Sequence, residues 1–132
     1  ATCDIVIATT GVRGLIKPDM VRPGQIIFAL SNPDAEIDPL RALERGAAFA
    51  ADGKGINNVL GFPGLFRGAL EARAHRFTDD MLIAAAHAIA NQTRGDDLVP
   101  DPLDRAVHAA VAAAVREAAL AGMHAERLAP LG

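Results

Sequence analysis

The chain has 132 residues, 51% of them hydrophobic, and a formal net charge of −3 at pH 7. These values are typical of one domain with a hydrophobic core and exclude an intrinsically disordered chain. No basic stripe is present, which argues against a nucleic-acid partner. No apolar run approaches the roughly 20 residues of a membrane-spanning helix, so no membrane contact is expected. The single cysteine, Cys3, excludes an intrachain disulfide and favours a cytoplasmic protein.

Three short apolar runs predict buried strands, at residues 4–8, 25–30 and 47–51. Each run is apolar throughout rather than alternating, which favours a parallel sheet covered on both faces. Each ends in a turn signal, and these are Thr9-Thr10-Gly11, Ser31-Asn32-Pro33 and Asp52-Gly53. The first run begins at once, without a methionine, so we expect the sequence to be a piece of a longer polypeptide.

A short helix is predicted between the second and third strands. Asp38 is placed to cap it, Pro39 lies in its first turn and Gly46 follows its end. Leu40 and Leu43 are expected to face the core. Strands and helices then alternate, which is typical of a doubly wound α/β fold.

The remainder of the chain is predicted to be helical. Pro63 begins one helix that runs to about Arg73, and Thr78 and Asp104 cap two more. Gly68 inside the first helix costs about 1 kcal/mol relative to alanine, so close packing or a ligand should offset it. The inward faces expected for the other two helices are Leu82, Ala85, Ala86 and Ile89, and then Val107, Val111, Ala114, Val115 and Ala118. Three helices exceed what three strands can cover, so we expect them to contact a part of the protein outside this sequence.

The candidate ligand-binding residues follow the predicted strands, where ligands bind in open α/β sheets. They are Thr9, Thr10 and Gly11 after the first strand, Asn32 after the second and the Asn57-Asn58 pair after the third. An asparagine amide offers both donors and an acceptor, so it can recognise a carboxamide, a hydroxyl or a carboxylate. The alternative, an Asx-turn or a helix cap, remains open for all three asparagines.

Other polar residues indicate structure rather than chemistry. The four histidines lack metal-ligand spacing, and His87 and His108 are expected at solvated helix positions. Arg67 is expected to form an ion pair in preference to binding a ligand. No glycine fingerprint and no phosphate loop are present. The sequence therefore predicts no catalytic residue and no metal ligand in this segment.

The order of these motifs resembles that of bacterial malic enzymes. The resemblance rests on Ser31-Asn32-Pro33, on Glu36-Ile37 and on the run Asn57-Asn58-Val59-Leu60-Gly61-Phe62-Pro63-Gly64, and it continues to the last helix. Malic enzymes convert malate to pyruvate and CO₂ with reduction of NAD or NADP, and they use Mg²⁺ or Mn²⁺.

The resemblance implies an α/β fold, the second half of a Rossmann-like doubly wound parallel sheet with three strands, followed by C-terminal helices. Residues 1–74 would carry the strands and ligand loops and residues 75–132 the helices, with the N-terminal catalytic domain outside the chain. It also implies site residues, which are Asn32, Asn57 and Asn58 for malate, and Thr9, Thr10, Gly11, Asn32 and Asn57 for NAD or NADP.

The resemblance further implies that the glycine fingerprint, the catalytic lysine and tyrosine and the acidic metal ligands lie outside this segment. The segment alone is expected to be inactive, and the complete enzyme to be a homo-oligomer. One departure is the short loop at residues 52–56, where many relatives have a longer one. Two alternatives stay open: a malolactic enzyme on the same scaffold, and a non-catalytic module that binds nucleotides or a partner.

Overall fold

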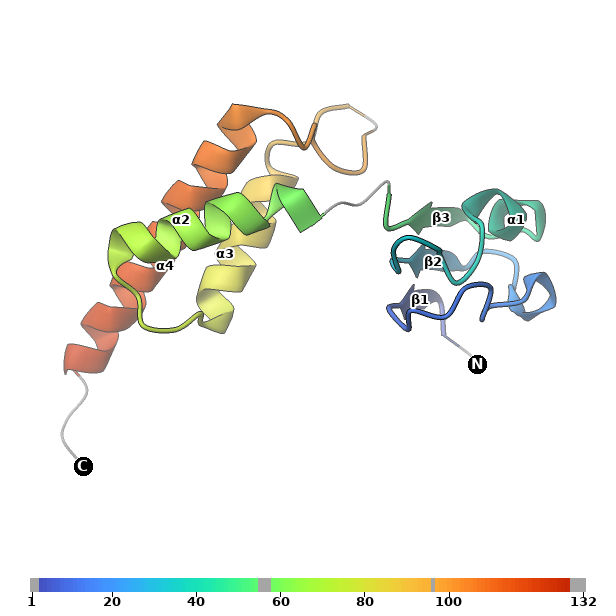
Figure 1. The fold of residues 1–132 in the computed structure, drawn as a ribbon, viewed down its shortest axis with the longest axis horizontal. Helices are drawn as coiled ribbons and strands as arrows, with labels where there is room; N and C mark the ends of the chain where they lie inside the picture. Colours follow the sequence, from blue (N-terminus) through green and yellow to red (C-terminus); the bar gives the residue numbers. More distant parts are fainter. Residues whose placement is uncertain (1–2, 55–57, 96, 129–132) are drawn as a thin grey trace. The chain divides into compact units, whose positions relative to one another are not determined.

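The computed structural model describes residues 3–54, 58–95 and 97–128 (Figure 1). Its elements are β1 (Ile5–Ala8), η1 (Pro18–Met20), β2 (Ile26–Ala29), α1 (Pro39–Glu44), β3 (Phe49–Asp52), η2 (Asn58–Leu60), α2 (Phe62–Ala72), α3 (Asp79–Ala90) and α4 (Arg105–Leu128). The chain divides into two compact units, Ala1–Asn57 and Asn58–Gly132, called here the strand unit and the helical unit. This division places α2 with the later helices, whereas the boundary expected from the sequence, after residue 74, would place it with the strands.

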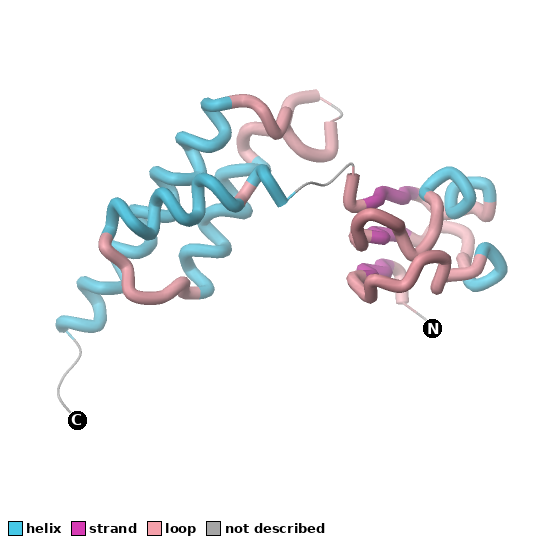
Figure 2. The backbone as a smooth tube through the Cα atoms, in the orientation of Figure 1, coloured by secondary structure: helices cyan, strands magenta, loops and turns pink. Residues whose placement is uncertain are grey.

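The strand unit holds a parallel sheet with the strand order β1-β2-β3, whose strands lie side by side in Figure 2. Ala8 of β1 pairs with Ala29 of β2, and Ala29 pairs with Asp52 of β3. All three strands therefore end at one edge of the sheet. The parallel sheet and the predicted strand positions are confirmed, with β3 two residues later than expected at its start.

One face of the sheet packs against α1 and the connecting segments. The Asp38 side chain caps α1 by accepting a hydrogen bond from the Leu40 backbone N–H at 2.8 Å, as predicted. The expectation that Leu40 and Leu43 face the core is wrong. Leu40 is 70% exposed, and Ala42 is the wholly buried residue of this six-residue helix. A helix this short presents little more than one position to the sheet, and here a small side chain takes it.

The opposite face of the sheet is open. The side chains of Ile5 and Ile7 are exposed, Ile7 to 66%, whereas Ile27 and Ala29 are buried on the packed face. Successive residues of a strand point to opposite faces, so each apolar run supplies both surfaces. Within the strand unit one face of the sheet is covered, and the expected cover of the other face stays a prediction.

The helical unit is built around α4, which packs against both α2 and α3 (Figure 1). Its core includes Val107, Val111 and Val115 of α4, all fully buried. Two glycines of α2 allow the closest approach. A Cβ atom on Gly64 would lie 2.6 Å from the Val111 Cβ, and one on Gly68 would lie 2.5 Å from the Ala112 carbonyl oxygen. Close packing is thus what offsets the cost of Gly68 within the helix.

The buried face of α3 differs from the predicted one. Met81 and Ala85 are buried, with Ala88 and Ile89 packed beside them, whereas Leu82 is 47% exposed and Ala86 is exposed. Half of the predicted stripe is wrong, because the buried face of α3 is turned towards Met81 and Ala88, with Ala85 and Ile89 common to both faces. The Thr78 cap is confirmed by its side chain, which accepts from the Met81 N–H at 3.4 Å.

Residues Arg105–Ala125 of α4 are long and apolar enough, with a mean hydropathy of 1.3, to meet the criteria for a membrane span. This corrects the expectation that no run approaches that length. Core helices of folded domains meet the same criteria, and α4 owes much of its hydropathy to alanine. Its buried valines contact α2 and α3, so its place in the fold is that of a core helix.

Candidate functional site

The candidate site lies at the edge of the sheet where β1, β2 and β3 end. The segment 9–11 leaves β1 there, Ser31 and Asn32 follow β2, and Gly53 follows β3. Thr9, Thr10, Gly11 and Asn32 are all exposed. The strand unit thus brings four of the predicted site residues to one edge.

Glu36 connects two of these loops and is the residue that sequence reasoning did not assign to the site. Its side chain is completely buried. Oε1 accepts hydrogen bonds from the Thr10 N–H at 2.7 Å, from the Thr10 hydroxyl at 2.8 Å and from the Ser31 hydroxyl at 2.6 Å. One carboxylate oxygen therefore joins the ends of β1 and β2.

The environment of Glu36 favours its charged form. Burial raises the pKa of its carboxyl, but the hydrogen bonds from Ser31 and from Thr10 outweigh burial and lower the pKa from 4.5 to about 2. Glu36 is ionised at neutral pH and acts as an acceptor only. The sequence signal that could have found it is an acidic residue between Ala35 and Ile37, three positions after the turn proline and beside a residue of the core.

Asn32 has a structural contact on one side of its amide. Its Nδ2 donates to the Gly53 carbonyl oxygen at 3.2 Å, which ties the end of β2 to the end of β3. Gly53 is needed for this approach, since a Cβ there would lie 2.8 Å from Nδ2 and 2.5 Å from the Leu30 carbonyl oxygen. The peptide bond between Asn32 and Pro33 is cis. The residue remains exposed, so the structural and the ligand-binding interpretations of Asn32 are compatible.

The Asn57-Asn58 pair is only partly covered by the structure. Asn57 lies outside the described residues. Asn58 begins η2 at the start of the helical unit, and the structure does not describe its side chain. Their contacts with malate or cofactor stay predictions.

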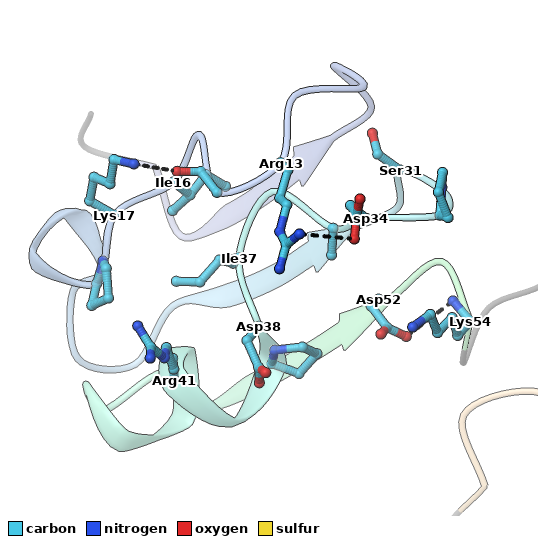
Figure 3. A pocket seen from close by; sticks show the side chains of 15 residues that line it. Arg13, Ile16, Lys17, Ser31, Asp34, Ile37, Asp38, Arg41, Asp52 and Lys54 are labelled. Carbon is cyan, nitrogen blue, oxygen red and sulfur yellow. Dashed lines mark hydrogen bonds and ion pairs between the residues drawn. The ribbon is translucent and has the colours of Figure 1, made fainter.

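A cleft of about 480 Å³ opens beside the site within the strand unit (Figure 3). Its walls come from the segment 13–18, from the segment 31–41 and from Asp52 and Lys54. Four cationic side chains (Arg13, Lys17, Arg41 and Lys54) and three carboxylates (Asp34, Asp38 and Asp52) line it. Arg13 and Asp34 pair at 3.9 Å, and both side chains are largely exposed. The cleft is therefore a polar, solvated recess, and no sequence motif singles it out.

The residues set aside as structural behave largely as predicted. Arg67 pairs with Glu71 one turn further along α2, with 2.7 Å between Nε and Oε1. His87 is exposed, as expected. His108 is not solvated: it is half-buried, and its Nε2 lies 2.9 Å from the Pro102 carbonyl oxygen. Within the described ranges, no three histidine, cysteine or acidic side chains come together as a metal site.

Comparison with known proteins shows the family of this chain. Residues 39–120 match the family described as "Malic enzyme, NAD binding domain". The chain belongs to the malic enzyme family. It is 66% identical to the NAD-dependent malic enzyme 1 of Bacillus subtilis (strain 168), over 119 residues that cover 90% of this chain and 27% of that enzyme.

Further malic enzymes match at lower identity. The bifunctional malic/malolactic enzyme of Bacillus subtilis (strain 168) is 42% identical over 130 residues, which cover 89% of this chain and 32% of that enzyme. The crystal structure of the malic enzyme from Pyrococcus horikoshii Ot3 superposes with a TM-score of 0.80 at 41% identity, over 92% of this chain and 31% of that one. The chain thus spans about a third or less of the length of these relatives. The Rossmann-like α/β fold of the malic enzyme NAD-binding domain is confirmed.

Proposed function

We propose that this chain forms one wall of the cofactor and substrate cleft of an NAD- or NADP-dependent malic enzyme. The complete enzyme oxidises malate and decarboxylates it, so that malate and NAD(P)⁺ yield pyruvate, CO₂ and NAD(P)H. The observation that carries the proposal is the set of loops at the sheet edge, fixed to one another through Glu36 and Asn32, in a chain of the malic enzyme family.

The loops suit a dinucleotide cofactor. Ligands of open α/β sheets bind beyond the carboxyl ends of the strands, and the segment Thr9 to Gly11 and Asn32 are exposed at that edge. Gly11 has a φ of +72°, and a Cβ there would meet no atom within 4 Å, so a ligand can approach its backbone. A dinucleotide held there by Thr9, Thr10, Gly11 and Asn32 would supply a hydride acceptor for the oxidation of malate.

The residues of this chain bind and orient rather than transfer protons. Thr9, Thr10, Gly11, Asn32 and Asn57 would contact the cofactor, and Asn32, Asn57 and Asn58 would contact malate. An amide can donate to the malate carboxylate or accept from its hydroxyl, and holding two reactants in line is itself a large part of catalysis. The proton-transfer groups are assigned to the part of the enzyme outside residues 1–132.

The metal belongs outside this chain as well. The described residues bring together no set of carboxylates suited to Mg²⁺ or Mn²⁺. The resemblance to malic enzymes assigns the acidic metal ligands to the remainder of the polypeptide. The partners that this division implies are malate, the remainder of the same polypeptide and, as a homo-oligomer, further copies of it. A cytoplasmic location fits a chain with one free, exposed cysteine.

The test is an assay of the complete enzyme that carries this segment, with malate, Mn²⁺ and either NAD⁺ or NADP⁺. We expect malate-dependent formation of reduced cofactor together with equal amounts of pyruvate. Lactate formed without net reduced cofactor would instead indicate the malolactic reaction, a possibility kept by the 42% identity to a bifunctional malic/malolactic enzyme. No reaction of malate with either cofactor would contradict the proposal.

The non-catalytic alternative makes a different prediction for the isolated segment. A self-sufficient nucleotide-binding module binds NAD tightly by itself, whereas half of a cleft does not. We expect calorimetry of residues 1–132 with NAD to show weak binding or none, because no phosphate loop is present in the sequence. Tight binding would favour the module.

A further inference from the structure

We propose that Glu36 is a positioning residue for the cofactor of this enzyme and that it acts through Thr10 and Ser31. The inference rests on the proposed function, since it concerns the same cleft. Glu36 does not face the ligand itself: its side chain is fully buried, and the residues that it holds lie at the exposed end of the sheet.

The argument begins with the number of donors that converge on one atom. The Thr10 N–H, the Thr10 hydroxyl and the Ser31 hydroxyl all reach Oε1 of Glu36, at 2.6 to 2.8 Å. Oε2 adds a longer contact with the Ser31 N–H at 3.4 Å. Charge-assisted hydrogen bonds of this length are among the stronger ones in proteins. The carboxylate therefore fixes the backbone where β1 and β2 end.

The two hydroxyl groups that donate to Glu36 also accept hydrogen bonds from the backbone of the loop after β1. The Ser31 Oγ accepts from the Gly11 N–H at 2.8 Å, and the Thr10 Oγ1 accepts from the Val12 N–H at 3.3 Å. Three successive N–H groups of the loop, those of Thr10, Gly11 and Val12, are thus directed into the network. The loop cannot present them to a ligand without breaking it, and the open side of Gly11 is held outward instead.

A carboxylate is required for this arrangement, and a carboxamide is not equivalent. Glutamine keeps one acceptor oxygen, but its NH₂ group would occupy the place of Oε2, opposite the Ser31 N–H. Two donors would then face each other, and the charge that strengthens the three short bonds would be lost. Glu36→Gln keeps the volume of the side chain and loosens the loops that contact the cofactor.

The experiment compares Glu36→Gln with Glu44→Gln in the complete enzyme. Glu44 lies in α1 of the same unit and is exposed, so it is a control for the same chemical change. We expect Glu36→Gln to raise KM for the dinucleotide about tenfold while kcat and KM for malate change less than about twofold. Glu44→Gln should leave all three unchanged. A fall in kcat with KM for the dinucleotide unchanged would overturn the proposal.

A direct measurement of NADH binding tests the role of Glu36 separately from the proposed malic enzyme activity. The dissociation constant of NADH, followed by its fluorescence, needs no turnover, so an enzyme inactive towards malate would refute the proposed function while this measurement still tests Glu36. If Glu36→Gln does not fold, Ser31→Ala decides, because Ser31 is half-exposed and its hydroxyl contacts both Glu36 and the Gly11 N–H. We expect Ser31→Ala to weaken NADH binding about threefold; unchanged binding would overturn the role of the network.

Discussion

The strand unit and the helical unit differ in what their most unusual residues do: a buried glutamate fixes loops in the first, and glycines allow close helix packing in the second. In the strand unit, a buried charge and the turns around it organise loops at the edge of the sheet. In the helical unit, glycines replace side chains so that two helices can touch. The Gly64 and Gly68 positions of α2 lie against Val111 and Ala112 of α4, with no space for a methyl group. The proposed binding residues lie in the first unit apart from Asn58, and close packing explains the two glycines of the second unit.

This contrast changes the interpretation of the run from Gly61 to Gly68. In sequence it follows the two asparagines and is predicted to open a helix, with either close packing or a ligand to offset the cost of Gly68. The structure assigns Pro63 to the first turn of α2 and both later glycines to the interface with α4. A motif next to a site can thus be specific because of packing alone.

The units also share a feature, which is an apolar surface that each leaves open. Ile5 and Ile7 lie on the uncovered face of the sheet, and Phe62, Phe66 and Leu70 recur every four residues along α2, all exposed. The Phe62 and Phe66 rings lie 4.6 Å apart and cover each other only in part. Exposed apolar groups in such numbers are typical of surfaces that other protein segments cover.

The largest expected effect tests the buried charge of the strand unit. The pKa of Glu36 is lowered from 4.5 to about 2, so its stabilisation is complete above about pH 4.5 and is lost as the pH falls towards 2. The whole shift corresponds to on the order of 3 kcal/mol. Hydrogen exchange of the Thr10 amide, measured across this range, should show protection falling with pH. The same titration of Glu36→Gln should lack that fall, and equal profiles for both proteins would refute the assignment.

The next effect concerns the glycine contact of the helical unit. Gly68→Ala places a methyl group 2.5 Å from the Ala112 carbonyl oxygen, so α2 and α4 must move apart. We expect the free energy of unfolding to fall by about 2 kcal/mol, measured by urea denaturation and circular dichroism. Gly122→Ala in α4 is the matched control, because no atom lies within 4 Å of its Cβ position, and it should stabilise by about 0.5 to 1 kcal/mol. A Gly68→Ala protein as stable as the parent would show that the interface yields easily.

A third prediction asks whether function also reaches the start of the helical unit. We expect Asn58→Ala in the complete enzyme to lower kcat/KM for malate by at least about tenfold, or about 1.4 kcal/mol of transition-state stabilisation. Asn91→Ala, at the exposed end of α3, is the control for the same substitution and should leave kcat/KM unchanged. Unchanged kinetics for Asn58→Ala would confine the site of this chain to the strand unit.

The smallest expected effect is the loss of one helix cap in each unit, which tests whether the two units unfold separately. Asp38→Ala and Thr78→Ala each remove a helix cap, one in each unit, and each should cost about 1 kcal/mol. Hydrogen exchange resolved by residue should show weaker protection of α1 and β2 for the first variant and of α3 and α4 for the second. If Thr78→Ala weakens the protection of β2 equally, the two units unfold as one.

Much of this architecture could be predicted because its signals are local. Asp38 and Thr78 cap their helices as expected, since a cap depends on the next three residues. The strand ends and their turns were also predicted, so Thr9, Thr10, Gly11 and Asn32 reach one edge of the sheet. The faces of the helices were predicted less well, as Leu40 and Leu82 show. Alanine-rich helices carry apolar residues on several sides, so the pattern alone does not select one.

The sequence by itself determined the strands, the helix caps and the loops that carry the candidate ligand-binding residues, because each follows from a few neighbouring residues. Only the tertiary structure decided the hydrogen bonds of Glu36, whose partners Thr10 and Ser31 lie 26 and 5 residues away along the chain. It also decided that Gly64 and Gly68 pack against α4, a helix that begins some 40 residues later. Burial and close contact between distant segments are properties of the packed chain, and no local pattern records them.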